Sequence, residues 1–488
     1  MIAPSGRAAC PRVRGVIIPV LDEIAPRFAA GAQNRRLRTP ALISKDTRLK
    51  PTLIKALTLW AVLLTATAAP FGAGAVTQIQ FWHAMEGVPG EALEQLVARF
   101  NASQKDWQVV PVFKGGYQET LQAGVLAARA GKSPHLLQVY EVGTAGMMAS
   151  PKFFKPLHQL AAENKMRLET YGPSVSAFFS DSGGKLLALP FNNSTPVMYY
   201  NRDKFIKAKL DPDKPPKTWR ELQAVLLTLY DAGEGCPYTT SWQSWVHLEN
   251  TSAWHNYPFA SENNGLGGPR AVLEFNSYLM MKHLSLMSSW VKSRLFLYSG
   301  RTNQADFRFA AGECAVLTSS SAAYSSFKRA APFKLGVAPL PYHEDVNKAP
   351  YNTLIGGAAL WTMSGKNAAD YAGVARFLEF LASPVVAAEW SEKTGYVPVT
   401  RGSYLALKNT GHFKEDPDLD IAITQLIGVK PGNFAKGVRL GYFPGIRDII
   451  DEELEKVWDG SKAPKSALDD AVQRGNLLLR QFEKSAGN

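Results

Sequence analysis

Apolar and polar residues alternate along several short stretches of the chain, and between them apolar residues recur every three or four positions. In VTQIQFW (76–82) the alternation predicts a strand, and the spacing of apolar residues over 93–100 predicts the helix that follows it. The stretches WQVVPVF (107–113) and HLLQVYEV (135–142) are predicted to be the next two strands, again with a helix between them. Strands that alternate with helices predict an α/β protein with a mostly parallel sheet.

Two later helices are marked by the residues at their beginnings. Thr218 and Glu221 have the spacing of a capping box, in which each side chain bonds a backbone N–H group at the start of a helix. Pro444 and Gly445 precede the second helix, whose buried face is marked by apolar residues at 450, 454 and 457. A chain of 488 residues is too long for one ordinary core, so we expect at least two lobes.

The first 75 residues differ in charge from the rest of the chain. They contain eleven Lys and Arg residues against three Asp and Glu residues, and so account for eight of the twelve net positive charges. The remainder is only mildly basic, and we expect no nucleic-acid partner.

A basic segment, the apolar run ALTLWAVLLTATAA (56–69) and then Ala73-Gly74-Ala75 predict a secretory signal peptide that is cleaved after about Ala75. A membrane anchor is the weaker alternative, because about 20 apolar residues are needed to span a bilayer. The role of residues 1–44, which lie upstream of this signal, stays open. A misassigned translation start and twin-arginine export through Arg35-Arg36 are two alternatives.

Two cysteines, Cys236 and Cys314, remain after the predicted cleavage. In an oxidising compartment they can form a disulfide, and as two buried thiols they can equally stay unpaired. Their spacing does not decide between these alternatives.

Polar and aromatic residues follow three predicted strands, where ligands bind in open α/β sheets. They are Trp82-His83 with Glu86, Gly115-Gly116-Tyr117, and Tyr140-Glu141. The sequence contains no G-x-S-x-G, H-E-x-x-H or C-x-x-C motif, and AGKS (130–133) lacks the first glycine of a phosphate loop. These absences lower the expectation of catalysis, although a dispersed pair of acids would escape such a search.

The segment YYNRDKFIKAKLDPDKPPKTWRELQ (199–223) resembles the entry to the second lobe in extracellular solute-binding proteins of sugar-type ABC transporters. Further segments are similar to the glycerol-3-phosphate-binding members of this family, among them FWHAMEG (81–87), FKGGYQETLQAG (113–124), SWQSWVHLENTSAW (241–254), EKTGYVPVT (392–400) and GVRLGYFPGIRDIIDEELE (437–455). The resemblance extends from about residue 76 to the C-terminus.

This resemblance implies a periplasmic binding protein fold of type II, in which each of two lobes is a mostly parallel sheet flanked by helices, with a hinge between the lobes. One lobe is expected to comprise 76–194 plus about 358–405, and the other about 195–357 plus 406–488. The implied protein is a periplasmic monomer that closes over its ligand and delivers it to the permease subunits of an ABC transporter. No cofactor, metal or catalytic residue is implied.

The implied ligand is sn-glycerol 3-phosphate or a glycerophosphodiester such as glycerophosphocholine, and the sequence does not decide between them. Carried over position by position, the ligand contacts are Tyr117, Glu141, Ser194, Trp242, Trp245, Ser320, Gly357, Tyr396 and Arg447. The run that contains Ser320 departs from the Ser-Ser-Gly-Ser order of the family.

The chemistry of these side chains suits the two ends of such a ligand. Arg447, near a predicted helix start, can bind the phosphate through paired hydrogen bonds, and the Ser and Tyr hydroxyls can donate to its oxygens. Trp242 and Trp245 offer flat apolar faces to the glycerol carbons. Glu141 is expected at the hydroxyl end, because a carboxylate repels phosphate. Gly357 can allow close approach of the backbone to the ligand or serve the hinge.

Alternatives remain for several of these residues. Arg447 can instead be a surface residue paired with Asp448 or Asp451, and Arg439 is a second candidate for the phosphate. Trp254 is expected to pack in the core. For the whole protein, the alternatives are a secreted glycerophosphodiester hydrolase and a binding protein for a neutral disaccharide.

Overall fold

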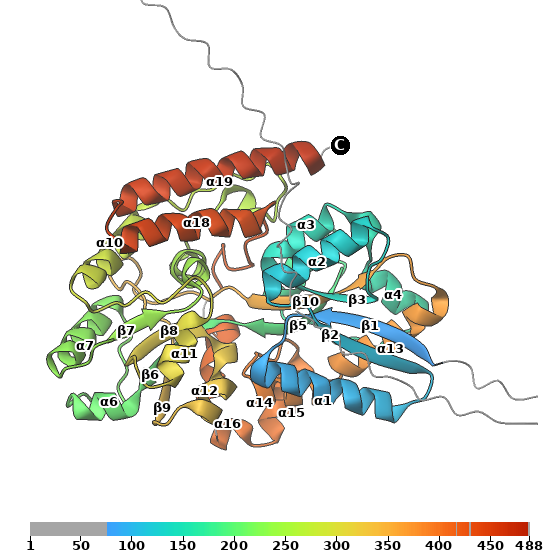
Figure 1. Cartoon of the computed structure of the whole chain (residues 1–488), viewed down its shortest axis with the longest axis horizontal. Helices are drawn as coiled ribbons and strands as arrows, with labels where there is room; N and C mark the ends of the chain where they lie inside the picture. Colours follow the sequence, from blue (N-terminus) through green and yellow to red (C-terminus); the bar gives the residue numbers. More distant parts are fainter. Residues whose placement is uncertain (1–75, 416, 429–430, 487–488) are drawn as a thin grey trace, which may run out of the picture. The chain divides into compact units, whose positions relative to one another are not determined.

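The computed structural model describes residues 76–415, 417–428 and 431–486, and these form two sheets with helices around them (Figure 1). The predicted signal peptide and residues 1–44 lie outside the described residues. The first sheet contains β1 (Thr77–His83), β2 (Trp107–Phe113), β3 (Leu136–Tyr140), β4 (Phe154–Lys155), β5 (Leu189–Ser194) and β10 (Gly356–Met363). The second contains β6 (Pro196–Asn201), β7 (Tyr238–Thr240), β8 (Val316–Ser320) and β9 (Leu335–Ala338).

Helices flank both sheets, and one set of them accompanies the first sheet. Those that accompany the first sheet are α1 (Gly87–Ser103), α2 (Tyr117–Arg129), α3 (Thr144–Met148), α4 (Leu157–Asn164), α5 (Pro173–Phe178), α13 (Ala368–Ala382), α14 (Pro384–Thr394) and α15 (Arg401–Asn409). The others are α6 (Arg202–Lys207), α7 (Trp219–Asp231), α8 (Thr251–Trp254), α9 (Ser261–Asn264), α10 (Tyr278–Lys292), α11 (Gln304–Ala310), α12 (Tyr324–Ala330), α16 (His412–Glu415), α17 (Asp418–Ile423), α18 (Phe443–Trp458) and α19 (Pro464–Ala486). Helices α18 and α19 run side by side (Figure 1).

The first sheet is built around parallel strands, as predicted, but it is mixed. Strand β1 pairs in parallel with β2 and β3, and its alternation buries Ile79 and Phe81 completely. Strand β10 then inserts antiparallel between β3 and β5. In the second sheet β6 is antiparallel to both β8 and β9. The predicted α/β fold with helices around each sheet is confirmed. Within the sheets the pairing is mixed and not mostly parallel, because strands that return from distant parts of the chain complete both sheets.

Strand β6 lies between two hydrophobic cores, and its successive side chains point alternately into one and the other. Val197 and Tyr199 pack with the apolar residues around the first sheet, whereas Met198 and Tyr200 pack with those of α7, α10, α18 and α19. Successive side chains of a strand point to opposite faces, so one strand can contribute to both cores.

The predicted capping box of Thr218 and Glu221 is present at the start of α7. The second predicted helix, α18, begins one residue before Pro444, at Phe443.

The chain crosses between the two sheets at neighbouring points. Only Thr195 separates β5 from β6, and its hydroxyl bonds that of Thr353 in the segment that returns to β10. Gln425, in η5 (Thr424–Gly428), links the crossings: its side chain donates to the Pro196 carbonyl at 2.9 Å and accepts from the Leu340 N–H at 2.6 Å. These linked crossings join the two sheets, and a hinge at this place stays a prediction. The residue boundaries given for the lobes above stay a prediction.

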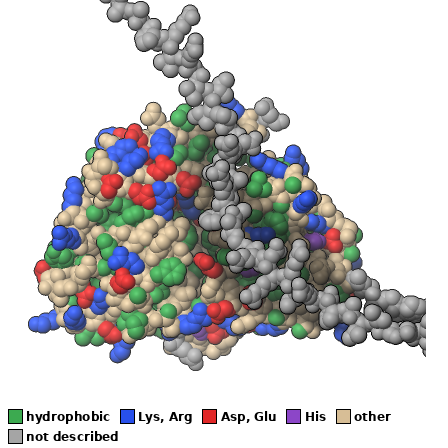
Figure 2. Space-filling view, viewed as in Figure 1, with side chains coloured by type: hydrophobic (Ala, Val, Ile, Leu, Met, Phe, Trp, Pro, Cys, Tyr) green, Lys and Arg blue, Asp and Glu red, His purple; other side chains and the backbone are tan. Residues whose placement is uncertain are grey.

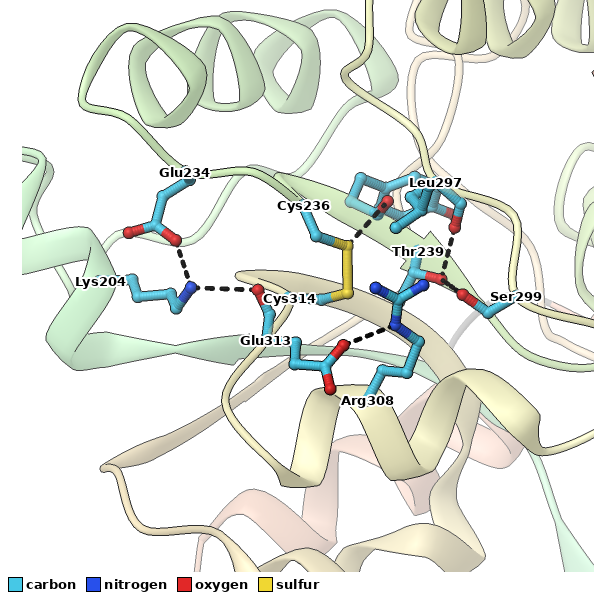
Figure 3. The surroundings of a disulfide bond; sticks show 10 residues. Lys204, Glu234, Cys236, Thr239, Leu297, Ser299, Arg308, Glu313 and Cys314 are labelled. Carbon is cyan, nitrogen blue, oxygen red and sulfur yellow. Dashed lines mark hydrogen bonds and ion pairs between the residues drawn. A yellow bond between two sulfur atoms is a disulfide. The ribbon is translucent and has the colours of Figure 1, made fainter.

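Cys236 and Cys314 form a disulfide across 78 residues of sequence (Figure 3). Lys204 lies beside it, where its ammonium pairs with Glu234 and donates to the Glu313 carbonyl at 3.2 Å. The bond therefore fixes the segment before β7 to the segment before β8.

The surface over α18 and α19 mixes charges of both signs (Figure 2). Glu453 accepts from Lys456 and Arg474, each at 2.8 Å, and also pairs with Lys462.

Among the described residues, no single helix has both the length and the apolar composition of a membrane span, although α13 and α14, bent by 65°, meet these criteria together.

Replacing both cysteines with serine is expected to lower the free energy of unfolding by about 4 kcal/mol, because the cross-link restricts a long loop in the unfolded chain. Urea denaturation with and without dithiothreitol measures this change. The reductant should lower the midpoint of the wild type and leave that of the double variant unchanged. Equal midpoints for both proteins without reductant would show that the bond contributes no stability.

Candidate functional site

Arg447 lies in the second turn of α18, with 13% of its side chain exposed. Its Nε donates to Glu249 Oε1 at 2.7 Å and its Nη2 donates to Glu249 Oε2 at 2.8 Å, so this pair is bidentate. Nη2 also lies 2.8 Å from Oε1 of Glu141. Burial alone would lower the pKa of Arg447, but the two carboxylates outweigh it and raise that pKa. One charged guanidinium thus lies between two buried carboxylates.

The alternative of Arg447 as a surface residue paired with Asp448 or Asp451 is wrong. The start of α18 is anchored by Phe443 and Ile446, both fully buried, and the guanidinium lies 5.2 Å from the centre of the Phe443 ring. This packing directs the side chain inward and adds a cation–π contact. Nη1 makes no hydrogen bond to any described residue, and Arg447 stays a predicted ligand contact.

Glu249 was not predicted as a site residue. It lies in η3 (Trp245–Asn250), a π-helical turn, and is 2% exposed. The Asn250 side chain fixes this turn by donating to the Trp245 carbonyl at 3.1 Å and accepting from the Leu354 N–H at 2.8 Å. The sequence held one signal for it, because Glu249 is the only Asp, Glu, Lys or Arg between Glu234 and Glu262. A lone charge in so long a neutral stretch indicates a buried partner.

Glu141 follows β3 directly, as the first residue of η1 (Glu141–Gly143), and is 8% exposed. Burial raises the pKa of its carboxyl and the charge of Glu249 adds to this, whereas Arg447 opposes it. Because η1 packs against α18, the Glu141 carboxylate contacts the Arg447 guanidinium. The expectation that Glu141 faces the hydroxyl end of the ligand stays a prediction.

The hydroxyls of Tyr117 and Tyr396 lie together, 3.4 Å apart. The Tyr117 hydroxyl accepts from Asn192 Nδ2 at 2.7 Å, and Asn192 Oδ1 in turn accepts from Gln138 at 2.8 Å. The Tyr396 hydroxyl donates to Met85 Sδ at 3.8 Å, so the Tyr117 O–H proton is directed toward the Tyr396 oxygen. Burial raises the pKa of both tyrosines, and Glu141 raises them further, so both stay protonated donors.

Ser194 and Gly357 lie at the edge of the first sheet next to Glu141. Strand β10 begins between β3 and β5, with Gly356 opposite Ser194 and Ala358 opposite Tyr140. Gly357 has a φ of +93°, and a Cβ there would lie 1.8 Å from the Asn192 carbonyl oxygen, so only glycine is accommodated. Both residues stay predicted ligand contacts.

Ser320 ends β8 in the second sheet, and its Oγ accepts from the Ala322 N–H at 3.2 Å. Its own O–H proton remains available to donate. The Ser321 N–H bonds the Thr195 carbonyl at 2.9 Å, which places the end of β8 beside the crossing that follows Ser194. No hydrogen bond or ion pair of the described residues joins Ser320 to Arg447.

The two predicted ligand tryptophans differ in their surroundings. Trp245 is 5% exposed and covers Gly356, where an added Cβ would lie 2.6 Å from its ring. Trp242 is partly exposed and has a φ of 54°, a backbone conformation that bulky residues rarely adopt. Its N–H bonds the Thr302 carbonyl at 2.9 Å, which helps to hold this conformation. Strained residues of this kind cluster at ligand sites.

Two other expectations concern residues outside the site. Trp254 is 2% exposed and donates to the Leu340 carbonyl at 3.0 Å, so the prediction of a core residue is confirmed. Arg439 donates to the carbonyls of Phe178, Ser180 and Leu266, which fixes it as a structural residue. Within the described ranges, no group of three or more His, Cys, Asp or Glu residues has an arrangement that would hold a metal ion.

Two sheets joined by neighbouring crossings, with a buried cation, carboxylates and hydroxyls at the strand ends, define a two-lobed binding protein of the periplasmic type II fold. Residues 95–421 match the family described as bacterial extracellular solute-binding protein, and the chain belongs to this family.

Two relatives illustrate how far the similarity extends. The sn-glycerol-3-phosphate-binding periplasmic protein UgpB of Yersinia pseudotuberculosis is 47% identical over 427 residues, which cover 87% of this chain and 97% of the relative. The protein of the same name from Escherichia coli O6:K15:H31 is 48% identical over 430 residues, covering 86% of this chain and 98% of the relative.

Solved structures share the fold at lower identity. UgpB of Mycobacterium tuberculosis in complex with glycerophosphocholine has a TM-score of 0.72 at 20% identity, covering 83% of this chain and 98% of that one. A solute-binding protein of Thermotoga lettingae bound with α-D-tagatose has a TM-score of 0.67 at 19% identity, covering 83% of this chain and 100% of that one.

Replacing Arg447 with methionine is expected to destabilise the protein by about 3 to 5 kcal/mol at pH 8, because two buried carboxylates lose their cation. The pKa of the Glu141 carboxyl is already raised by burial, and without the opposing charge of Arg447 it rises further above its value in the unfolded state. The folded variant then binds more protons, and its stability falls as the pH rises. Urea denaturation at pH 5.5 and pH 8 measures this. A destabilisation that is equal at both values would show that the carboxylates do not depend on Arg447.

Proposed function

We propose that the protein is a periplasmic receptor that captures sn-glycerol 3-phosphate, or a glycerophosphodiester such as glycerophosphocholine, and delivers it to the membrane subunits of an ABC importer. The observation that carries the proposal is the 47% identity, over 87% of the chain, to a relative named for this ligand and this compartment. The buried guanidinium of Arg447, with a free Nη1 edge, supports it independently.

In the proposed complex the phosphate accepts from Arg447 and from the hydroxyls of Tyr117 and Tyr396. The start of α18 favours an anion as well, because helix N-termini carry free N–H groups and a partial positive charge. Trp242 and Trp245 cover the glycerol carbons. The hydroxyls of Ser194 and Ser320 approach from the two sheets, so the ligand is enclosed only when the lobes close.

Binding alone accounts for useful capture of so small a ligand. Glycerol 3-phosphate has about ten non-hydrogen atoms, and small ligands reach at best about 1.5 kcal/mol per atom. Micromolar affinity requires about 8 kcal/mol, which is well below this ceiling. No catalytic step is needed, and we infer that the protein is a receptor and not a hydrolase.

Titration calorimetry with sn-glycerol 3-phosphate is expected to show binding, and Trp242→Ala to weaken it by about 1 to 3 kcal/mol through the loss of one apolar contact. Tyr278→Ala, which removes an exposed aromatic ring from α10, is the matched control and should bind like the wild type. Maltose serves as the neutral sugar. Binding of maltose and not of glycerol 3-phosphate would overturn the proposal, and unchanged affinity in Trp242→Ala would remove that residue from the site.

Incubation with glycerophosphocholine separates a receptor from a hydrolase. The diester is expected to be recovered intact after prolonged incubation, because the buried carboxylates are held by Arg447 and are not placed to activate water. Chromatographic measurement of released choline checks this. Catalytic release that scales with protein concentration and is lost in Glu141→Gln would identify an enzyme.

A further inference from the structure

The cluster of Arg447, Glu141 and Glu249 carries an excess of negative charge. It contains one cation and two carboxylates, all largely buried, with side-chain exposures of 13%, 9% and 3%. Elements on every side contribute groups that face Glu141: Tyr117 from α2, Tyr140 from β3, Tyr396 after α14, Glu249 from η3 and Arg447 from α18. Of these side chains, only Arg447 is cationic.

A phosphate monoester brings nearly two negative charges near neutral pH. Its entry would change the net charge of the cluster from about −1 to about −3 in a site that excludes water, where like charges strongly disfavour one another. Movement of a carboxylate out of the site is opposed by the packing of η1 against α18. Uptake of a proton removes one charge without any rearrangement of the backbone.

Resting on the proposed function, we propose that phosphate enters this site together with a proton, which Glu141 takes up, while Glu249 keeps its bidentate contact as the positioning residue that holds Arg447. Glu249 shares two hydrogen bonds with the guanidinium, whereas Glu141 shares only the bond to Nη2. A phosphate that competes for Nη2 therefore deprives Glu141 of its cation first. The protonated carboxyl then donates its O–H to a ligand oxygen, and no other bond is formed or broken.

The surroundings of Glu141 support its assignment as the group that takes up the proton. Burial already raises the pKa of Glu141, and Glu249 adds to it. Asp451, one turn beyond Arg447, is the competing proton acceptor, because burial raises its pKa to about 7. Its Oδ1 has no hydrogen-bond partner, and it does not pair with Arg447 among the described ion pairs.

Titration calorimetry in two buffers of different ionisation enthalpy at pH 8 tests the proposal on the mature protein. Two probes are used, sn-glycerol 3-phosphate and glycerophosphocholine, because the phosphodiester has no group that titrates near neutral pH. We expect uptake of about one proton per molecule of the monoester, with affinity rising about tenfold for each unit of falling pH. Uptake by the diester should be smaller but measurable.

Three variants locate the proton. Glu141→Gln should abolish uptake with both probes, whereas Asp451→Asn and the matched α18 surface variant Glu452→Gln should retain it. Should Glu141→Gln fail to bind, Glu249→Gln provides the second test, since removal of one charge from the cluster should also reduce uptake.

The outcomes separate this proposal from the proposed function. Absence of binding of either probe to the wild type overturns both. Binding without proton uptake overturns only the coupling. Uptake that persists in Glu141→Gln with the monoester alone assigns the proton to the ligand, and uptake lost in Asp451→Asn assigns it to Asp451; either result overturns the role of Glu141.

Discussion

A guanidinium buried between two carboxylates is the interaction on which the rest of the site depends. The bidentate pair of Arg447 and Glu249 leaves the guanidinium no freedom to turn toward solvent, and the contact with Glu141 joins α18 to the end of the first sheet. A lone buried charge would be very costly, and paired charges repay that cost only when their geometry is good. The arrangement therefore favours the proposed role, in which Arg447 is held ready for an anion.

The fold places this cluster at the meeting point of its two sheets. Glu141 follows β3 and Ser194 ends β5, and the carboxyl ends of these two strands lie at the same edge of the first sheet. Strand β10 starts at that edge, where Gly357 has a backbone conformation in which only glycine is accommodated. The crossings between the sheets, which Gln425 links, lie next to this edge, directly after Ser194. Small changes of backbone angle in these crossings can therefore move one set of predicted ligand contacts relative to the other without disturbing either core.

Local patterns predicted the local structure well. The strands at 76–82 and 107–113 and the capping box at Thr218 were found because alternation and capping depend on neighbouring residues alone. The antiparallel β10 was not predicted, because its partners lie about 160 to 220 residues earlier in the chain. Pairing of the cysteines was undecided for the same reason. The candidate ligand residues came from family resemblance, and Glu249 was missed because its importance lies in its contact with Arg447.

The most direct measurement is a crystal structure of the mature protein with sn-glycerol 3-phosphate. The account predicts a phosphate within hydrogen-bond distance of the Arg447 guanidinium, with the bidentate contact to Glu249 retained and both tryptophans against the glycerol carbons. A phosphate bound elsewhere, with Arg447 bonded to both Glu141 and Glu249 as in the present structure, would contradict it.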